Sequence, residues 1–133
     1  MDTDIKNLIR TGTVSSINAE NGTVRVTYDD KDGILSGELH TIARGGRTDK
    51  DYWLPDVGEP VVCLFNPASK NLNDGWVIGT SFSHKNPPNA RVATKRRIDF
   101  GGGSYFEFDR ADGSLTIHCT GPIKINGSTI NLN

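Results

Sequence analysis

The stretch IDFGGGSYFEFDRADGSLTIHCTGPIKINGSTINLN, residues 98–133, decides the fold of this chain. Its large apolar residues occur in pairs, and one polar residue separates the two members of each pair. The five pairs are Ile98 with Phe100, Phe106 with Phe108, Leu115 with Ile117, Ile123 with Ile125, and Ile130 with Leu132. A period of two residues is typical of a β-strand that turns alternate side chains to one face of a sheet. The stretch therefore predicts five very short strands.

Turn-forming residues separate these pairs, and one apolar face results. The turns are Gly101 to Gly103, Asp112-Gly113, Gly121-Pro122 and Asn126-Gly127, all typical of tight corners. Nothing else in residues 98–133 covers the apolar face. Because three identical copies around one axis enclose such faces completely, we expect a short homotrimeric, intertwined β-helix or β-prism here. Its predicted core consists of Ile98, Phe100, Phe106, Phe108, Leu115, Ile117, Cys119, Ile123, Ile125, Ile130 and Leu132.

Residues 11–83 predict a separate barrel in front of this prism. Asn21-Gly22 is a strong hairpin signal, and apolar and polar residues alternate after it. The apolar run Val61 to Phe65 predicts a strand that is buried on both faces. About five strands are expected, as in an OB-type barrel. The predicted barrel core consists of Val14, Val24, Val26, Trp53, Leu54, Val61, Val62, Leu64, Phe65, Trp76 and Ile78.

Two further segments complete the expected organisation of an all-β chain. Residues 1–10 place Ile5, Leu8 and Ile9 at helical spacing, which predicts a short N-terminal helix or arm. Residues 84–97, HKNPPNARVATKRR, contain two prolines among polar residues and are predicted to be a linker.

Within the predicted barrel, between the first hairpin and Val61, the segment ILSGELHTI at residues 34–42 predicts one more strand.

Charge and cysteine content exclude several classes of protein. Fifteen basic and sixteen acidic residues give a formal net charge of -1, so no overall field attracts nucleic acid or an anionic membrane. Cys63 and Cys119 lie far apart in apolar strand contexts without a paired metal-ligand spacing, which predicts buried free thiols. The opening MDTDIKNLIR does not resemble a secretory signal, and no run is apolar for long enough to span a membrane. We therefore expect synthesis in the cytoplasm.

Catalysis is an alternative that the acidic residues raise. Asp49, Asp51, Asp56, Glu59, Glu107 and Asp109 are candidates for an acid and base pair, as in a cell-wall hydrolase. None of them belongs to a recognisable catalytic motif, and most are expected in turns or on solvent-facing strand positions. The glycine runs ARGGR and FGGGS lack the lysine and hydroxyl residue of a phosphate-binding loop. The sequence therefore favours a protein that is not an enzyme.

Binding of single-stranded nucleic acid is the stronger alternative, because OB barrels combine aromatic platforms with basic grooves. The candidate residues are Tyr28, Tyr52, Trp53, Arg44, Arg47, Lys95, Arg96 and Arg97. Trp53 is expected to pack against the barrel instead, and the basic triplet lies at the start of the predicted prism. A non-puncturing structural trimer, such as a segment of a tail fibre, is the third alternative.

Three segments carry a resemblance to a known family. TGTVSSINAENGTVRVTYDDKDG, DYWLPDVGEPVVCLF and DGWVIGTSF, all within residues 10–82, are similar to the phage baseplate assembly protein V family, the central spike of contractile tails. The resemblance implies an OB-fold domain seated in the baseplate hub and a trimeric tip that is driven through the target cell envelope. It also implies that the protein belongs to a virion or phage-tail-like particle made in the host bacterial cytoplasm.

The C-terminal part departs from the long members of that family. They carry an HxH motif that holds an axial iron at the tip, whereas Cys119 and Thr120 follow His118 here. Strand parity also turns His118 outward, so we expect neither the iron nor any other cofactor. The sequence ends at INLN, directly after an apolar pair, which leads us to expect a separate tip protein similar to the PAAR-repeat caps.

Overall fold

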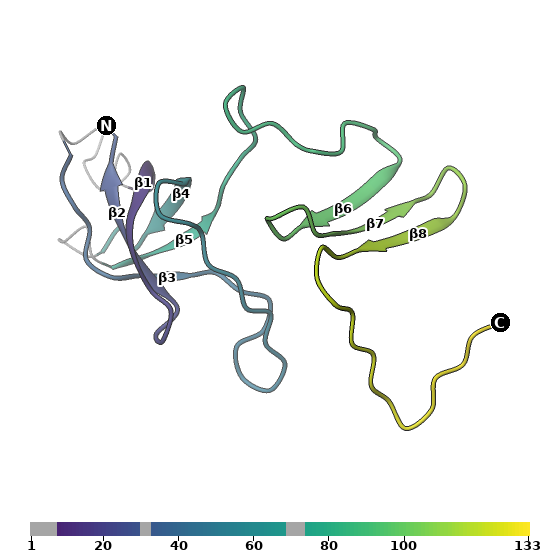
Figure 1. Ribbon diagram of the computed structural model, residues 1–133. Helices are drawn as coiled ribbons and strands as arrows, with labels where there is room; N and C mark the ends of the chain where they lie inside the picture. The colour runs from purple at the N-terminus through teal and green to yellow at the C-terminus, as the bar shows by residue number, and fades with distance from the viewer. Residues whose placement is uncertain (1–7, 30–32, 69–73) are drawn as a thin grey trace. The chain divides into compact units, whose positions relative to one another are not determined.

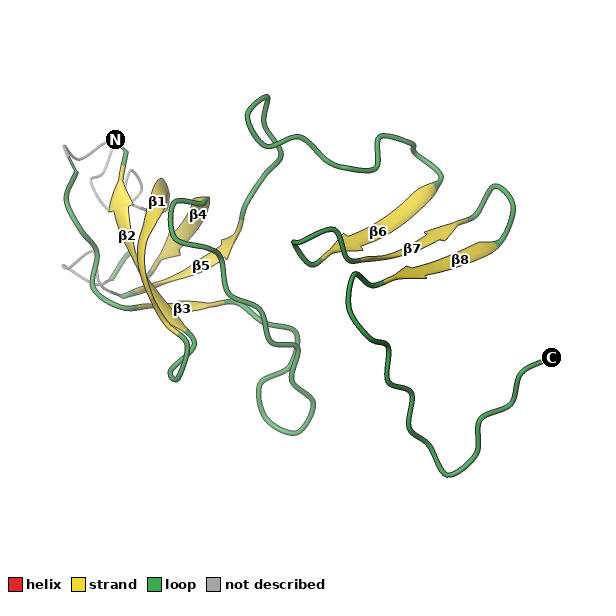
Figure 2. Ribbon diagram, viewed as in Figure 1, coloured by secondary structure: helices red, strands yellow, loops and turns green. Residues whose placement is uncertain are grey.

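The computed structural model describes residues 8–29, 33–68 and 74–133. The chain divides into two compact units, Met1–Ser81 and Phe82–Asn133, coloured purple to teal and green to yellow in Figure 1. Every regular element of the described residues is a β-strand, as Figure 2 shows. Among these residues there is no helix with the length and apolarity needed to cross a membrane. The predicted all-β class is confirmed.

The first unit is a closed barrel of five strands. They are β1 (Ile9–Asn18), β2 (Thr23–Tyr28), β3 (Leu39–Thr41), β4 (Pro60–Phe65) and β5 (Gly75–Gly79). Their order around the barrel is β1-β2-β3-β5-β4, and β1 closes the ring by pairing with β4. Only the pair β3 and β5 is parallel, while the other neighbours are antiparallel. The expected barrel of about five strands is therefore confirmed.

Strand β1 belongs to two ladders, because its first half pairs with β4 and most of its length pairs with β2. A bulge between Val14 and Ser16 interrupts the second ladder, and a bulge bends a strand and increases its twist. Gly12 lies where the two ladders overlap. A Cβ atom there would lie 2.5 Å from Val26 Cγ1 and 2.6 Å from the Thr27 carbonyl oxygen, so the close approach of β1 and β2 requires glycine.

The barrel core is made by the inward-facing residues of all five strands. It comprises Val14, Val24, Val26, Tyr28, Leu39, Val61, Cys63, Phe65 and Val77, with Trp53 and Leu54 packed against it. Tyr28 and Phe65 meet edge to face with their ring centres 5.6 Å apart. Five of the predicted core residues are among the fully buried ones, and the predicted burial of Cys63 is confirmed. Tyr28, Leu39 and Val77 are core residues that were not predicted.

Four predicted core residues lie on the outside of the barrel. Val62 and Leu64 are half-buried, and Trp76 and Ile78 are 37% and 46% exposed. The alternation of the strands explains this, because Val61, Cys63 and Phe65 of β4 and Val77 of β5 point inward and leave their neighbours outside. The predictions that Trp76 and Ile78 are core residues and that β4 is buried on both faces are therefore wrong for the single chain.

Several predicted boundaries also shift. Strand β1 begins at Ile9, inside the predicted N-terminal helix or arm, the rest of which falls mainly outside the described residues. The strand expected over residues 34–42 is limited to β3, and Leu35 forms only an isolated bridge to Thr27. The first unit ends at Ser81, two residues before the predicted end of the barrel.

The second unit contains a three-stranded antiparallel sheet in the order β6-β7-β8. The strands are β6 (Lys95–Asp99), β7 (Tyr105–Asp109) and β8 (Ser114–His118). Strand β6 starts inside the predicted linker 84–97, because Lys95, Arg96 and Arg97 pair with β7. Residues 119–133 follow as an extended tail that forms no strand in the single chain.

Candidate assembly interface

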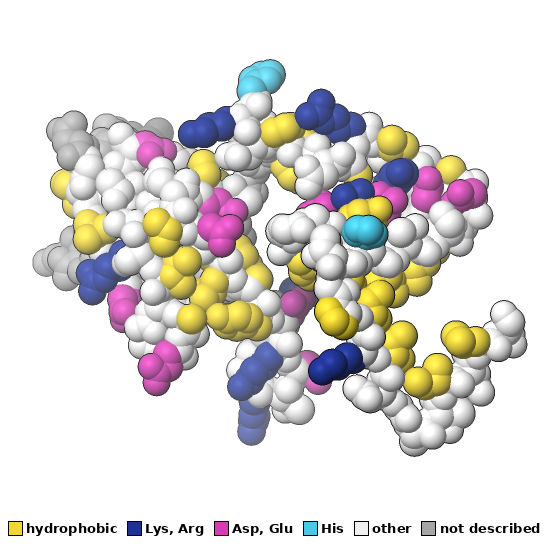
Figure 3. Space-filling model, in the orientation of Figure 1, with side chains coloured by type: hydrophobic (Ala, Val, Ile, Leu, Met, Phe, Trp, Pro, Cys, Tyr) yellow, Lys and Arg dark blue, Asp and Glu magenta, His cyan; other side chains and the backbone are white. Residues whose placement is uncertain are grey.

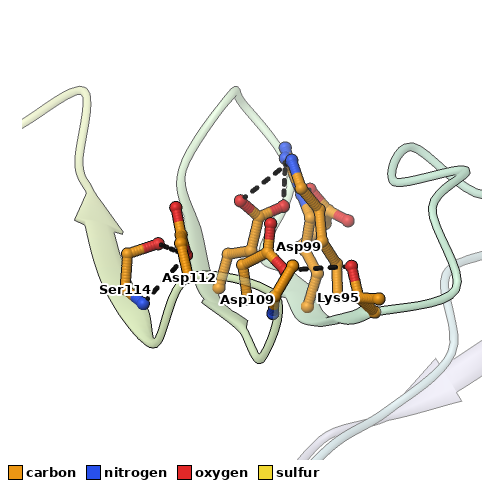
Figure 4. Close-up of polar contacts among 9 residues, drawn as sticks. Lys95, Asp99, Asp109, Asp112 and Ser114 are labelled. Atoms are coloured by element: carbon orange, nitrogen blue, oxygen red, sulfur yellow. Dashed lines mark hydrogen bonds and ion pairs between the residues drawn. The ribbon is translucent and has the colours of Figure 1, made fainter.

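Two glycine-containing turns shape the sheet of the second unit. Gly101, Gly102 and Gly103 all have positive φ between β6 and β7, and Gly113 has a φ of 74° between β7 and β8. In the second turn one Asp112 carboxylate oxygen accepts hydrogen bonds from the Ser114 backbone N–H at 3.1 Å and from its hydroxyl at 2.7 Å (Figure 4). These bonds lower the pKa of Asp112, since they stabilise its charged form.

The strand register places the apolar residues of the sheet on one face. Ile98 lies opposite Phe106, which lies opposite Ile117, and in the next row Phe108 lies between Leu115 and the exposed Arg96. Directly paired residues share a face, so the five apolar side chains form one surface, which we call the apolar sheet face, and Arg96 lies at its β6 edge. In the single chain they are between 42% and 57% exposed. Figure 3 shows hydrophobic side chains gathered on one side of this sheet and continuing along the tail.

The opposite face of the same sheet is polar and tightly paired. The Glu107 carboxylate lies 3.5 Å from Lys95 Nζ and 3.3 Å from Arg97 Nη1, and Glu107 is only 9% exposed. Arg97 also donates to Asp99 at 2.9 Å, and the bond to Asp99 first, then the bond to Glu107, raises the pKa of Arg97. Figure 4 shows Lys95 and Asp99 at these contacts, and beside them Asp109, which accepts a hydrogen bond from the Thr94 hydroxyl at 2.9 Å.

Aromatic stacking extends this polar face. The guanidinium carbon of Arg97 lies 3.6 Å from the centre of the Tyr105 ring, a cation–π arrangement. Tyr105 in turn stacks on His118 with 5.3 Å between ring centres. His118 therefore belongs to the polar face, the outward position that strand parity predicts. The sheet is amphipathic, with one face satisfied by its own ion pairs and the other uncovered.

The tail continues the apolar surface without any strand partner. Ile123, Ile125, Ile130 and Leu132 are between 52% and 92% exposed. Cys119 is an exposed free thiol, so the prediction that it is buried is wrong for the single chain. The strands predicted at residues 123–125 and 130–132 are absent from the single chain, because a strand requires a neighbouring backbone and no described residue pairs with the tail in this way. Phe100 lies just after β6 and is 69% exposed.

The residues considered for nucleic-acid binding are dispersed or engaged. Tyr28 is 1% exposed, so its ring cannot stack on a base. The Trp53 indole N–H donates to the Ile42 carbonyl oxygen at 2.8 Å, and Lys95 and Arg97 are paired with carboxylates. Tyr52, Arg44 and Arg47 lie together on an exposed loop, where Arg44, Gly45 and Asp49 to Asp51 border a shallow hollow of about 420 Å³.

The candidate catalytic carboxylates are likewise spread over separate elements. Asp49 and Asp51 border the hollow just described, Asp56 and Glu59 lie in the turn before β4, and Glu107 and Asp109 belong to β7. Partial burial raises the pKa of Glu59, and the charge of Asp56 raises it further. Within residues 8–29, 33–68 and 74–133, no three His, Cys, Asp or Glu side chains gather in a way that would hold a metal ion.

No protein-family model matches the sequence, and no curated protein matches it either.

Proposed function

We propose that this chain forms a homotrimer that acts as the central spike at the baseplate hub of a contractile phage tail or phage-tail-like particle. The single observation that carries the proposal is the apolar sheet face with its apolar tail. Ile98, Phe106, Phe108, Leu115 and Ile117 remain about half exposed although their strands are fully formed. Monomeric proteins rarely expose contiguous apolar surfaces of this kind, which usually mark an interface.

Two further copies of the same chain are the partner that fits this surface best. The second unit has open backbone edges at β6 and β8, and open edges favour pairing with another strand. Two sheets packed face to face would bury the apolar faces but would not surround the tails. Three copies are the smallest ring that encloses an axis, so that apolar side chains fill the centre and edges and tails pair around it.

The polar face supports the same orientation. In a ring of three sheets the apolar faces turn inward and the polar faces turn to solvent. The ion pairs of Glu107 with Lys95 and Arg97 are formed within one chain and need no partner on that side. A closed ring of hydrogen-bonded strands around a dry centre resists axial force, as a mechanical spike requires, and this role needs no catalytic step and no cofactor.

The strand topology of the barrel supports a place for this chain at the baseplate hub. Its strand order β1-β2-β3-β5-β4 with one parallel pair agrees with an OB-type barrel, the domain that the resemblance to the baseplate assembly protein V family implies. In this proposal the barrels contact hub proteins of the baseplate. The opposite end carries a separate PAAR-like tip protein and crosses the target cell envelope when the sheath contracts. The protein would be made in the cytoplasm of the host bacterium and assembled into the particle.

The trimer is tested by adjacent substitutions on opposite faces of β8. Ile117→Lys puts a charge into the proposed centre, whereas Thr116→Lys puts the same residue on the polar face, opposite Glu107. Light scattering coupled to size exclusion should give three times 14.5 kDa for the native chain and for Thr116→Lys, and one chain mass for Ile117→Lys. A native chain that is monomeric at micromolar concentration would refute the proposal.

The role of the trimer requires a second measurement on particles. Antibody labelling in electron micrographs of intact contractile tails should place this protein at the centre of the baseplate. Labelling on fibres at the periphery would favour the non-puncturing structural alternative. A salt-sensitive change in anisotropy of labelled single-stranded DNA on addition of the purified trimer would favour the nucleic-acid alternative.

A further inference from the structure

The outer surface of the barrel carries an apolar patch that is separate from the apolar sheet face. Ile9 of β1 lies opposite Leu64 of β4, which lies opposite Trp76 of β5. Val62 and Ile78 extend the same outer surface along β4 and β5. We call these five residues the outer barrel patch. Ile9, Trp76 and Ile78 are 61%, 37% and 46% exposed in the single chain.

The pattern of β4 and β5 indicates that this patch is covered in the working protein. Val61, Cys63, Phe65 and Val77 fill the barrel core, and the residues between them are also apolar. Strands with apolar residues on both faces are typical of sheets that are buried on both sides. The barrel interior accounts for one face of these strands, and among residues 8–29, 33–68 and 74–133 no element covers the outer barrel patch.

The neighbourhood of the patch permits contact between identical copies. None of its five residues is charged, so copies that meet through the patch suffer no repulsion between like charges there. The chain also leaves the barrel directly from β5 through residues 80–94 to β6. A segment of this length spans at most about 54 Å when fully extended. If three second units are joined, their barrels stay within reach of one another at an effective concentration on the order of millimolar.

From these observations we infer that the outer barrel patches of the three barrels pack against one another, so that two further copies of this chain cover each patch. The inference rests on the proposed trimer and adds a second, independent contact surface to it. The contact is weak for a free barrel and becomes populated because the second units hold the barrels together. The barrels then form a compact base instead of three loosely tethered domains.

Trp76 reports directly on this contact, because it lies in the patch and Trp53 is the only other tryptophan. Iodide quenching of fluorescence is measured for the native chain and for Trp76→Phe, and the difference gives the accessibility of Trp76. The same pair of measurements is made in the Ile117→Lys background, in which the second units are separated. We expect Trp76 to be severalfold less accessible in the native trimer than in the Ile117→Lys chain.

A second pair of variants tests the patch without disturbing the second unit. Ile78→Asp adds a charge to the patch, and Val57→Asp adds one at an exposed apolar position in the turn before β4. Both chains should remain trimers, but Trp76 should become accessible to iodide only in Ile78→Asp. Equal protection of Trp76 in Ile78→Asp and in the native trimer would contradict the inference.

The outcomes separate this inference from the proposed function. A native trimer in which iodide reaches Trp76 as easily as in the Ile117→Lys chain overturns the inference and leaves the trimer intact. The same result is expected if a different protein, rather than another copy, covers the patch. A native chain that is monomeric overturns both the trimer and the inference.

Discussion

Truncation of Phe108 to alanine should weaken the trimer by a calculable amount. Phe108 is 44% exposed in the single chain, and a phenylalanine has about 200 Å² of surface to bury. Complete burial in the trimer therefore removes roughly 90 Å² per chain from water. At about 25 cal/mol per Å² this contributes about 2 kcal/mol per chain, or about 6 kcal/mol per trimer.

The expected shift follows from the stoichiometry. About 6 kcal/mol changes the dissociation constant of the trimer by more than about 10⁴-fold, and the midpoint concentration depends on the square root of that constant. Phe108→Ala should therefore raise the midpoint of dissociation roughly 10²-fold in a dilution series followed by sedimentation velocity.

Tyr105→Ala is the matched control, because Tyr105 is an aromatic residue of the same strand on the polar face. Its midpoint should stay close to that of the native chain, since the ring contacts Arg97 and His118 of its own chain. Equal midpoints for Phe108→Ala and the native chain would show that Phe108 does not lie in the contact between copies.

Two further predictions concern the barrel and the cysteines. Gly12→Ala should lower the free energy of unfolding of the barrel by about 1–3 kcal/mol, because the added Cβ would collide with Val26 and the Thr27 carbonyl oxygen. Urea unfolding measures this loss, and Ser15→Ala, at an exposed position of β1, should be close to neutral. Equal losses in the two variants would contradict the steric argument. Burial raises the pKa of the Cys63 thiol to about 11 from 9.0, so the folded state holds this proton more tightly than the unfolded state, and the stabilising effect is complete below pH 9 and declines as pH rises towards 11. Thermal melts should therefore lose more stability between pH 9 and 11 in the native chain than in Cys63→Ala, and parallel losses would contradict this reasoning.

The fold of the barrel was predictable where the sequence pattern has one interpretation. The alternation after Asn21-Gly22 gives the right faces of β2, because Thr23, Arg25 and Thr27 separate apolar residues. Strands β4 and β5 gave no such contrast, since Trp76 and Ile78 are as apolar as Val77 between them. The same alternation puts Tyr28 on the buried face of β2, whereas burial of Leu39 in the three-residue strand β3 depends on how the barrel closes, which the local pattern does not encode.

The candidate interface was predictable as far as strand parity reaches. The apolar pairs of residues 98–117 share one face of the sheet, as the period of two residues predicts. The sequence analysis did not find the polar network around Glu107, because the partners Lys95 and Arg97 were assigned to a linker. The acidic and basic residues that alternate on the two sides of the 101–103 turn were the signal that would have found it. Residues 119–133 form no strand in the single chain, and in the proposed trimer their strand partners would come from other copies of the chain.

The double pairing of β1 has a consequence for how the barrel folds. The hairpin of β1 and β2 joins residues that are close in the sequence, whereas the ladder between β1 and β4 joins Ile9 to Leu64. Contacts between distant residues require a long loop to close and therefore form late. Until that ladder forms, the ring is open, and the apolar side chains on both faces of β4 lack their neighbours in β1. Exposed apolar strand edges of this kind favour aggregation, so closure of the ladder between β1 and β4 also protects the chain from other chains.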